Sequence, residues 1–282
     1  MYSSQLNFSE IVQVPINAKT MTVYHAIKGV GTLTTDDYSV VKTTPIGFNQ
    51  PIISLTFDDS WETNTSTAIP IMNTYGFKMT NYFATTYLLD PTDTDDTGRN
   101  GTTTVQYIYG LGNEIGSHSI THPWLTQIPA AQLDSELKDS KTTLEGMIGA
   151  GNIKSFATPY GEYNETVVTA INKYYASHRT VDEGYNLKNN YDVSRIKVQN
   201  MKKTTTLAEY QSWIDQAVKD KSWLVIVYHR VLTGTAADPL EDYDTPLADF
   251  TPQMTAIKNA VTNSGAAVLP VSQAIAATLP QL

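Results

Sequence analysis

The stretch Pro51-Ile-Ile-Ser-Leu-Thr-Phe-Asp-Asp59 decides the interpretation of the chain, because an apolar run here ends in two adjacent carboxylates. Its Ile, Leu and Phe residues are typical of a buried strand. Asp58 and Asp59 repel each other, so we expect a metal, a proton or a cationic neighbour to separate their roles. The alternative is that Asp59 or Ser60 merely caps a helix that starts near Trp61.

The composition limits the classes of partner. Of the 282 residues 41% are hydrophobic, which is enough for a sizeable core, and no apolar run reaches the ~20 residues of a membrane span. The net charge of -9 argues against nucleic acid and favours a neutral or cationic substrate. The absence of cysteine excludes disulfides, and 17 tyrosines among many Thr and Asn residues suit contacts with carbohydrate.

The order of the predicted elements changes near residue 46. Residues 1–45 contain three short predicted strands, too few for an independent core, and they loosely resemble the closing strands of a carbohydrate-binding β-sandwich. We therefore predict an N-terminal β extension over 1–45 and a main domain over 46–282. The acidic segment 90–98 is interpreted as a solvated loop, because no Glu stands at EF-hand spacing for calcium.

In the main domain, strands and helices alternate. The predicted helices include one from Trp61 to about Tyr75 and one over 252–263. Seven or eight strand–helix units in a domain of roughly 235 residues match the size of a (β/α) barrel. The residues most suited to catalysis follow several of the strands, so a barrel would bring them to one face.

Two histidines in Ser117-His-Ser-Ile-Thr-His-Pro123 stand four residues apart. On a helical turn this spacing puts both rings on one face, as a shared metal requires. Asp59 is the natural third ligand for His118 and His122, which leaves Asp58 free as a base. The alternative is a pair of surface histidines.

Two further segments favour chemistry at the same face. His229 ends the apolar run 223–228 and suits a general acid near neutral pH, although a structural histidine is the alternative. Thr158-Pro-Tyr-Gly161 is a tight turn that could aim a backbone N–H into the site, or simply an ordinary turn.

Taken in order, four motifs give a specific resemblance: Thr56-Phe-Asp-Asp59, His118-Ser-Ile-Thr-His122, Thr158-Pro-Tyr160 and Ile226-Val-Tyr-His229. The chain resembles the polysaccharide deacetylases of carbohydrate esterase family four, the NodB-type homology domain, over roughly residues 50–280. The resemblance implies a distorted (β/α) barrel with Asp58 as base, His229 as acid and the Tyr160 N–H as oxyanion donor. It also implies a divalent ion, Zn²⁺ first with Co²⁺ or Ni²⁺ as alternatives, held by Asp59, His118 and His122.

Two departures from the family pattern stand out. Ala157 occupies the position where the family usually has an arginine that orients the base, and the family's Trp-containing block is absent. As a hypothesis, Arg179 orients the base instead, or Asp182 orients His229. Ile226 is the one candidate by motif position for lining the acetyl pocket.

We therefore predict an enzyme that hydrolyses linear amides, removing acetyl groups from an N-acetylglucosamine polymer such as chitin, peptidoglycan or an exopolysaccharide. An O-acetyl xylan esterase with the same machinery is the first alternative. A sugar-binding barrel with weakened activity is the second. The substrate class predicts an extracellular or cell-surface location, although no signal peptide is visible in the sequence.

Overall fold

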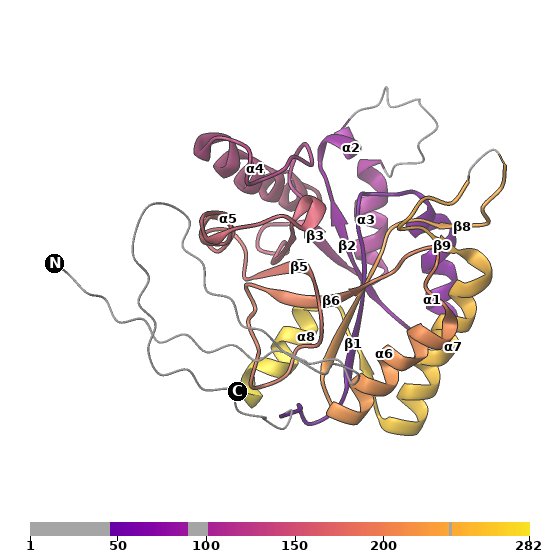
Figure 1. The fold of residues 1–282 in the computed structure, drawn as a ribbon. Helices are drawn as coiled ribbons and strands as arrows, with labels where there is room; N and C mark the ends of the chain where they lie inside the picture. The colour runs from indigo at the N-terminus through magenta and orange to yellow at the C-terminus, as the bar shows by residue number, and fades with distance from the viewer. Residues whose placement is uncertain (1–45, 90–100, 237–238) are drawn as a thin grey trace, which may run out of the picture. The chain divides into compact units, whose positions relative to one another are not determined.

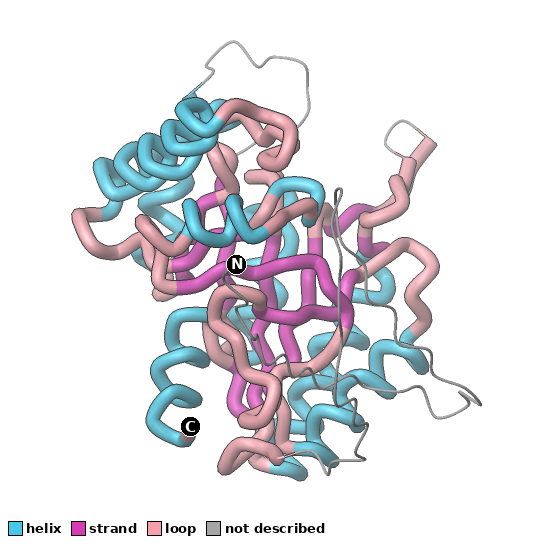
Figure 2. The backbone as a smooth tube through the Cα atoms, turned by 60° about the vertical axis from the view of Figure 1, so that its left-hand side comes forward, coloured by secondary structure: helices cyan, strands magenta, loops and turns pink. Residues whose placement is uncertain are grey.

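The computed structural model describes residues 46–89, 101–236 and 239–282. The predicted N-terminal strands and the acidic segment 90–98 lie outside these described residues. Parallel strands form the centre of the main domain, and helices surround them (Figures 1 and 2). The central strands are β1 (Ile52–Phe57), β2 (Met79–Phe83), β3 (Glu114–Ser117), β4 (Ser155–Ala157), β5 (Ser177–Glu183), β6 (Ile196–Asn200) and β7 (Trp223–Tyr228).

These seven strands close into a barrel because β1 pairs with both β2 and β7. All six residues of β1 are in register with β7, whereas β2 pairs only with Leu55–Phe57. A short parallel strand, β10 (Ala267–Val268), pairs with Ile52 and Ile53 at the start of β1. The predicted (β/α) barrel is therefore confirmed, with seven closing strands and an eighth, β10, that pairs with only two residues of β1.

Two groups of helices pack against the outside of the barrel. In one group α6 and α1 each contact α7, and in the other α3 and α5 each contact α4, as Figure 1 shows. The helices are η1 (Asn64–Ala68), α1 (Ile69–Tyr75), α2 (Thr86–Leu89), α3 (Thr102–Gly110), α4 (Ala130–Ile148), η2 (Pro159–Gly161), α5 (Glu165–Ile171), α6 (Leu207–Asp220), α7 (Leu247–Ser264), α8 (Val271–Thr278) and η3 (Leu279–Gln281). None of the described helices is both long enough and apolar enough to cross a bilayer.

Helix α8 and a buried carboxylate close the end of the barrel at which the strands begin. Glu114 accepts hydrogen bonds from the Thr80 hydroxyl at 3.0 Å, the Ser155 hydroxyl at 2.8 Å and the Ser272 N–H at 2.8 Å. Burial raises the pKa of Glu114, and these three donors oppose that rise. The donors belong to β2, β4 and α8, so this side chain joins the barrel wall to the helix that covers its base.

Two helix predictions need correction. The helix predicted over 252–263 begins at Leu247, so Pro252 lies inside it, where proline cannot donate the backbone hydrogen bond to the Ala248 carbonyl. The helix predicted from Trp61 is a π-helical turn over Asn64–Ala68 that continues into α1. The residue before that turn is Thr63, and its side chain makes no cap. The alternative that Asp59 or Ser60 caps this helix is therefore wrong.

Candidate metal and active site

The candidate residues gather at the carboxyl ends of the strands, around one pocket of about 950 Å³. The loops after β1, β3, β4 and β7 each contribute side chains to this pocket. The residues that line it include five of the predicted site residues, namely Asp58, Asp59, His118, His122 and His229, together with Tyr160. Parallel strands of a closed barrel end on one face, which explains why segments far apart in sequence meet here.

Three side-chain atoms converge at the centre of the pocket. Asp59 Oδ1 lies 3.4 Å from His118 Nε2 and 3.2 Å from His122 Nε2, and the two Nε2 atoms are 3.2 Å apart. His118 Nδ1 lies 2.7 Å from the Ala157 carbonyl oxygen, which can only accept, so Nδ1 carries the proton and Nε2 presents its lone pair. Three electron-rich atoms this close to one another require a shared cation or proton.

The surroundings favour an ionised Asp59 and a neutral His122. Burial would raise the pKa of Asp59, but the contacts with His118 and His122 outweigh it and hold that pKa well below its usual value. Burial lowers the pKa of His122 and so favours its neutral form. An ionised carboxylate and a neutral imidazole are the forms that bind a metal ion.

The two histidines meet through a bent loop and not through a helical turn. Residues 118–123 lie outside every helix, and the bend is made by Ser119 and His122, with φ of 71° and 56°. The Ser119 hydroxyl accepts the His122 N–H at 3.0 Å and stabilises the bend. These contacts bring both rings to the Asp59 carboxylate, and the helical turn that the spacing suggested for them is wrong.

Left-handed backbone is concentrated at this site. Of the six described non-glycine residues with positive φ, five lie in the site loops: Asp59, Ser60, Ser119, His122 and Tyr160. Each such residue costs about 1–3 kcal/mol, so the surrounding contacts must hold it in place. At the Tyr160 turn, Gly161 has a φ of 72°, and a Cβ on it would come within 2.0 Å of Val181. This turn therefore requires glycine after Tyr160.

Asp58 is paired with a buried arginine. Arg179 on β5 donates from Nη2 to both carboxylate oxygens of Asp58, at 2.6 and 2.5 Å. Its guanidinium carbon lies 5.1 Å from the Tyr82 ring centroid, and Nη1 donates to the Thr180 carbonyl at 3.2 Å. Arg179 is fully buried, so its charge requires an anionic partner, and Asp58 supplies it.

The arginine stands beside the position from which the family pattern would supply one. Ala157 and Arg179 are in register on the adjacent strands β4 and β5. Side chains of residues paired in this way leave the sheet on the same face. An arginine on β5 therefore reaches the aspartate from a position next to the one that Ala157 occupies on β4.

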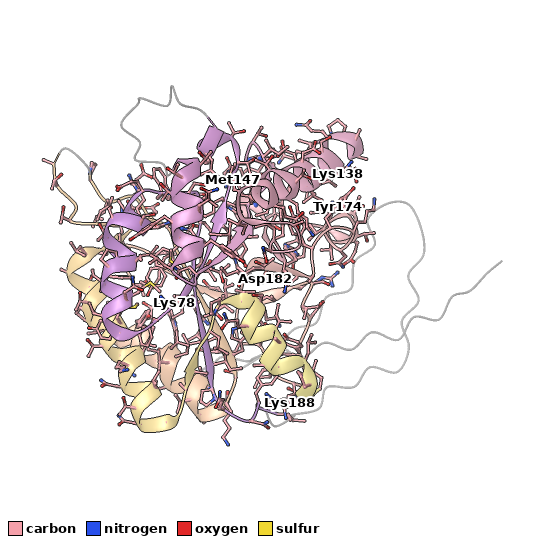
Figure 3. All side chains as sticks on the ribbon, turned by 180° about the vertical axis from the view of Figure 1, so that it is seen from behind. Lys78, Lys138, Met147, Tyr174, Asp182 and Lys188 are labelled. Carbon is pink, nitrogen blue, oxygen red and sulfur yellow. The ribbon has the colours of Figure 1, made fainter. Side chains whose placement is uncertain are left out.

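His229 lies on the opposite side of the trio from the Tyr160 turn. Its Nε2 is 3.9 Å from Asp59 Oδ2, and its Nδ1 has no hydrogen-bond partner among the described residues. Asp182, labelled in Figure 3, accepts a hydrogen bond from the Tyr163 hydroxyl and is not among the residues that line the pocket. The structure thus does not bring Asp182 to His229. Ile226 packs in the apolar cluster that joins the barrel to its helices, so its predicted place in the acetyl pocket is wrong.

Three residues near the centre were not predicted. Glu136 on α4 accepts the N–H groups of Ile120 and Thr121 at 2.8 and 2.9 Å, which lie between the two histidines in sequence. Trp124 and Tyr243 line the pocket. A charge within the apolar face of helix 130–148, and a tryptophan directly after His-Pro, were the signals available in the sequence.

Comparison with known proteins gives a consistent result. The model of the polysaccharide deacetylase family matches residues 46–177. A bifunctional xylanase/deacetylase of Pseudobutyrivibrio xylanivorans is 28% identical over 123 residues, which are 44% of this chain and 19% of that protein. The polysaccharide deacetylase YxkH of Bacillus subtilis is 28% identical over 148 residues. These residues are 51% of this chain and 50% of that protein. The chain thus spans half or less of the length of these relatives.

A solved structure supports the fold independently of these matches. The Xyl-CE4 domain of a multidomain xylanase from the hindgut metagenome of Trinervitermes trinervoides superposes with a TM-score of 0.51 and 21% identity. The superposition covers 81% of this chain and 91% of that domain. The family model thus matches the first half of the barrel, and this likeness shows the same fold over 81% of the chain.

Proposed function

We propose that the chain is a metal-dependent hydrolase that removes acetyl groups from an N-acetylated polysaccharide by cleaving the amide C–N bond. The observation that carries this proposal is the convergence of Asp59 Oδ1, His118 Nε2 and His122 Nε2, each 3.2–3.4 Å from the other two. Ligand atoms about 2.0–2.1 Å from a tetrahedral zinc ion stand about 3.3–3.4 Å from one another. The spacing therefore fits one zinc-like ion without rearrangement.

The donor set also fits a catalytic metal. Two imidazoles and one carboxylate are three protein ligands, which leaves a coordination position for water or substrate. When bound, the ion would acidify a water molecule and polarise the acetyl carbonyl. The resemblance to the family implies zinc as the metal. Cobalt or nickel could replace zinc, because both bind the same N and O donors.

Three groups of the chain would move or hold charge during the reaction. Asp58, oriented by Arg179, takes a proton from water as the water oxygen bonds to the acetyl carbon. The Tyr160 N–H donates to the carbonyl oxygen as negative charge develops there. His229 then gives a proton to the sugar nitrogen as the C–N bond breaks, so that acetate and a free amine leave.

An O-acetyl xylan esterase is the second candidate. Its support is that one relative is a bifunctional xylanase/deacetylase and that the similar domain belongs to a multidomain xylanase. An alkoxide leaves more readily than an amine, so this reaction would depend less on His229. We also propose an extracellular or cell-surface site of action.

Acetate release decides between these candidates. We expect the zinc-loaded chain to release acetate from chitooligosaccharides or peptidoglycan faster than from acetylated xylan, and a chelator to abolish release until zinc or cobalt is restored. Faster release from xylan would select the esterase. No release from any of the three substrates, with one metal bound, would contradict the proposed function and favour a sugar-binding barrel.

Moving the arginine between strands tests its role. Arg179→Ala should lower kcat by about 10–100-fold, because a misplaced base loses most of its effect. Ala157→Arg in that background should restore part of the activity, since the two positions leave the sheet on the same face. Arg179→Lys keeps the positive charge but loses the planar guanidinium. Its kcat should lie between that of the wild type and that of Arg179→Ala. Wild-type activity in folded Arg179→Ala protein would show that Asp58 needs no such partner.

Glu136 is expected to position the two histidines. Glu136→Gln removes the negative charge that accepts two N–H groups of the loop between the histidines. The affinity for zinc should fall about 10–100-fold, as for other residues that orient metal ligands. The matched control is Asp139→Asn, which removes an exposed carboxylate from the same helix. Competition against a chromogenic chelator measures both affinities. Equal zinc affinity in Glu136→Gln and Asp139→Asn would show that Glu136 only stabilises α4.

A further inference from the structure

A buried histidine on β5 lies behind the Tyr160 turn. His178 is fully buried and stands directly before Arg179 in the strand. Consecutive side chains of a strand point to opposite faces. Arg179 reaches Asp58 at the strand tips, so the imidazole of His178 leaves the barrel wall on its outer side. The proposed mechanism uses the arginine and gives the histidine no role.

Both ring nitrogens of His178 have a partner. Nδ1 lies 2.8 Å from the Ser194 carbonyl oxygen, which can only accept, so Nδ1 carries the proton. Nε2 then presents its lone pair, and it is in contact with the Thr158 hydroxyl. The hydroxyl therefore donates to Nε2. Burial lowers the pKa of His178 to about 4, so the ring stays neutral and keeps this lone pair at neutral pH.

Thr158 connects β4 to the Tyr160 turn. Thr158 is buried, and its N–H donates to the Arg179 carbonyl at 3.4 Å. Its own carbonyl accepts the Gly161 N–H at 3.1 Å, which closes the turn. Tyr160, inside this turn, has a left-handed backbone with a φ of 56°. Such a conformation persists only where surrounding contacts hold it, so the position of Thr158 sets that of the Tyr160 N–H.

The same imidazole also meets the far end of the turn. The Tyr163 ring stands edge-on to the His178 ring, with centroids 5.3 Å apart and an interplanar angle of 86°. The Tyr163 hydroxyl donates to Asp182, which belongs to β5 as well. Strand β5 thus contacts the chain two residues before Tyr160 and three residues after it.

We propose that His178 is a positioning residue for the oxyanion donor. By accepting the Thr158 hydroxyl, it fixes the Tyr160 turn and therefore the direction of the Tyr160 N–H. Arg179, the next residue, orients Asp58 from the other face of the same strand. The dipeptide His178-Arg179 then positions both the base and the oxyanion donor. This inference rests on the proposed function and adds to it a residue that does not touch the reacting atoms.

Removing one hydroxyl tests the Thr158–His178 hydrogen bond. Thr158→Val keeps the branched side chain but leaves Nε2 of His178 without a donor. The oxyanion develops only in the transition state, so kcat per bound zinc ion should fall about tenfold, with KM and zinc affinity changed by less than about twofold. Thr158→Ser keeps the hydroxyl and should retain most of the activity.

The matched control is Thr180→Val. Thr180 is buried on the same strand, and its hydroxyl donates to the Ile196 carbonyl at 2.9 Å. This change removes a comparable hydrogen bond, so it should lower the melting temperature about as much as Thr158→Val does, but with kcat unchanged. His178→Phe should lower kcat as Thr158→Val does. The double variant should be no slower than either single variant, because both remove the same interaction.

Three kinetic results would overturn the inference. Wild-type kcat in folded Thr158→Val protein would mean that the hydrogen bond does not position the turn. An equal loss of kcat in Thr180→Val would mean that the buried wall acts only through stability. Additive losses in the double variant would mean that His178 does not act through Thr158.

The wild type itself offers a test that needs no variant. Nitrogen-15 spectra of the imidazole at neutral pH should show His178 with a proton on Nδ1 and none on Nε2. A proton on Nε2 would contradict the inference, because that nitrogen could not then accept the Thr158 hydroxyl.

Amide hydrogen exchange separates this inference from the proposed function. Exchange in the peptide that covers the Tyr160 turn should be faster in Thr158→Val and His178→Phe than in the wild type, and unchanged in Thr180→Val. This result is expected whether or not the wild type releases acetate, so an inactive wild type would refute the proposed function alone. Unchanged exchange in both Thr158→Val and His178→Phe would refute the positioning role, even in an active enzyme.

Discussion

The pairing of β1 with β7 is the contact on which the site depends. Phe57 is in register with Tyr228, their rings stack at 5.0 Å, and the Asp58 N–H donates to the Tyr228 carbonyl at 3.0 Å. The next residue along each strand is Asp58 on one side and His229 on the other. Closing the barrel therefore sets the proposed base and the proposed acid side by side, with no contact needed between their side chains.

Two adjacent aspartates avoid mutual repulsion because different partners neutralise them. Arg179 binds Asp58 from inside the barrel, and the left-handed backbone of Asp59 turns that carboxylate toward the two histidines. In the proposed function, one aspartate is held for proton transfer and the other for a metal ion. The strain of positive φ at Asp59 and His122 is distributed over loops that the barrel wall, Ser119 and Glu136 hold in place.

Much of this arrangement could be predicted from the sequence, because strand ends carry their position in the local pattern. An apolar run followed by Asp58-Asp59 or by His229 marks a strand tip, and parallel strands bring such tips together. Arg179 could be proposed from its place after the Tyr160 turn. The contact of Arg179 with Asp58 depends on the register of β4 and β5, and the local sequence does not predict that register.

Other features could not be predicted from the sequence, for physical reasons. Spacing alone suggested a helical turn for His118 and His122, whereas two left-handed residues perform the same task. Glu136 reads as one more charge on a helix until its loop partners are known, and Ile226 faces the helices because strand residues alternate between the two faces. Trp124 and Tyr243 meet the site through long loops, whose paths depend on tertiary contacts.

The division of labour between the two aspartates is the central claim, and paired substitutions measure it most directly. Zinc content and acetate release should be determined together for Asp58→Asn and Asp59→Asn. The account predicts that Asp58→Asn keeps about one zinc ion per chain and loses turnover by about 10²–10⁴-fold, whereas Asp59→Asn loses the zinc itself. Substantial turnover in Asp58→Asn, or equal loss of zinc in both variants, would contradict it.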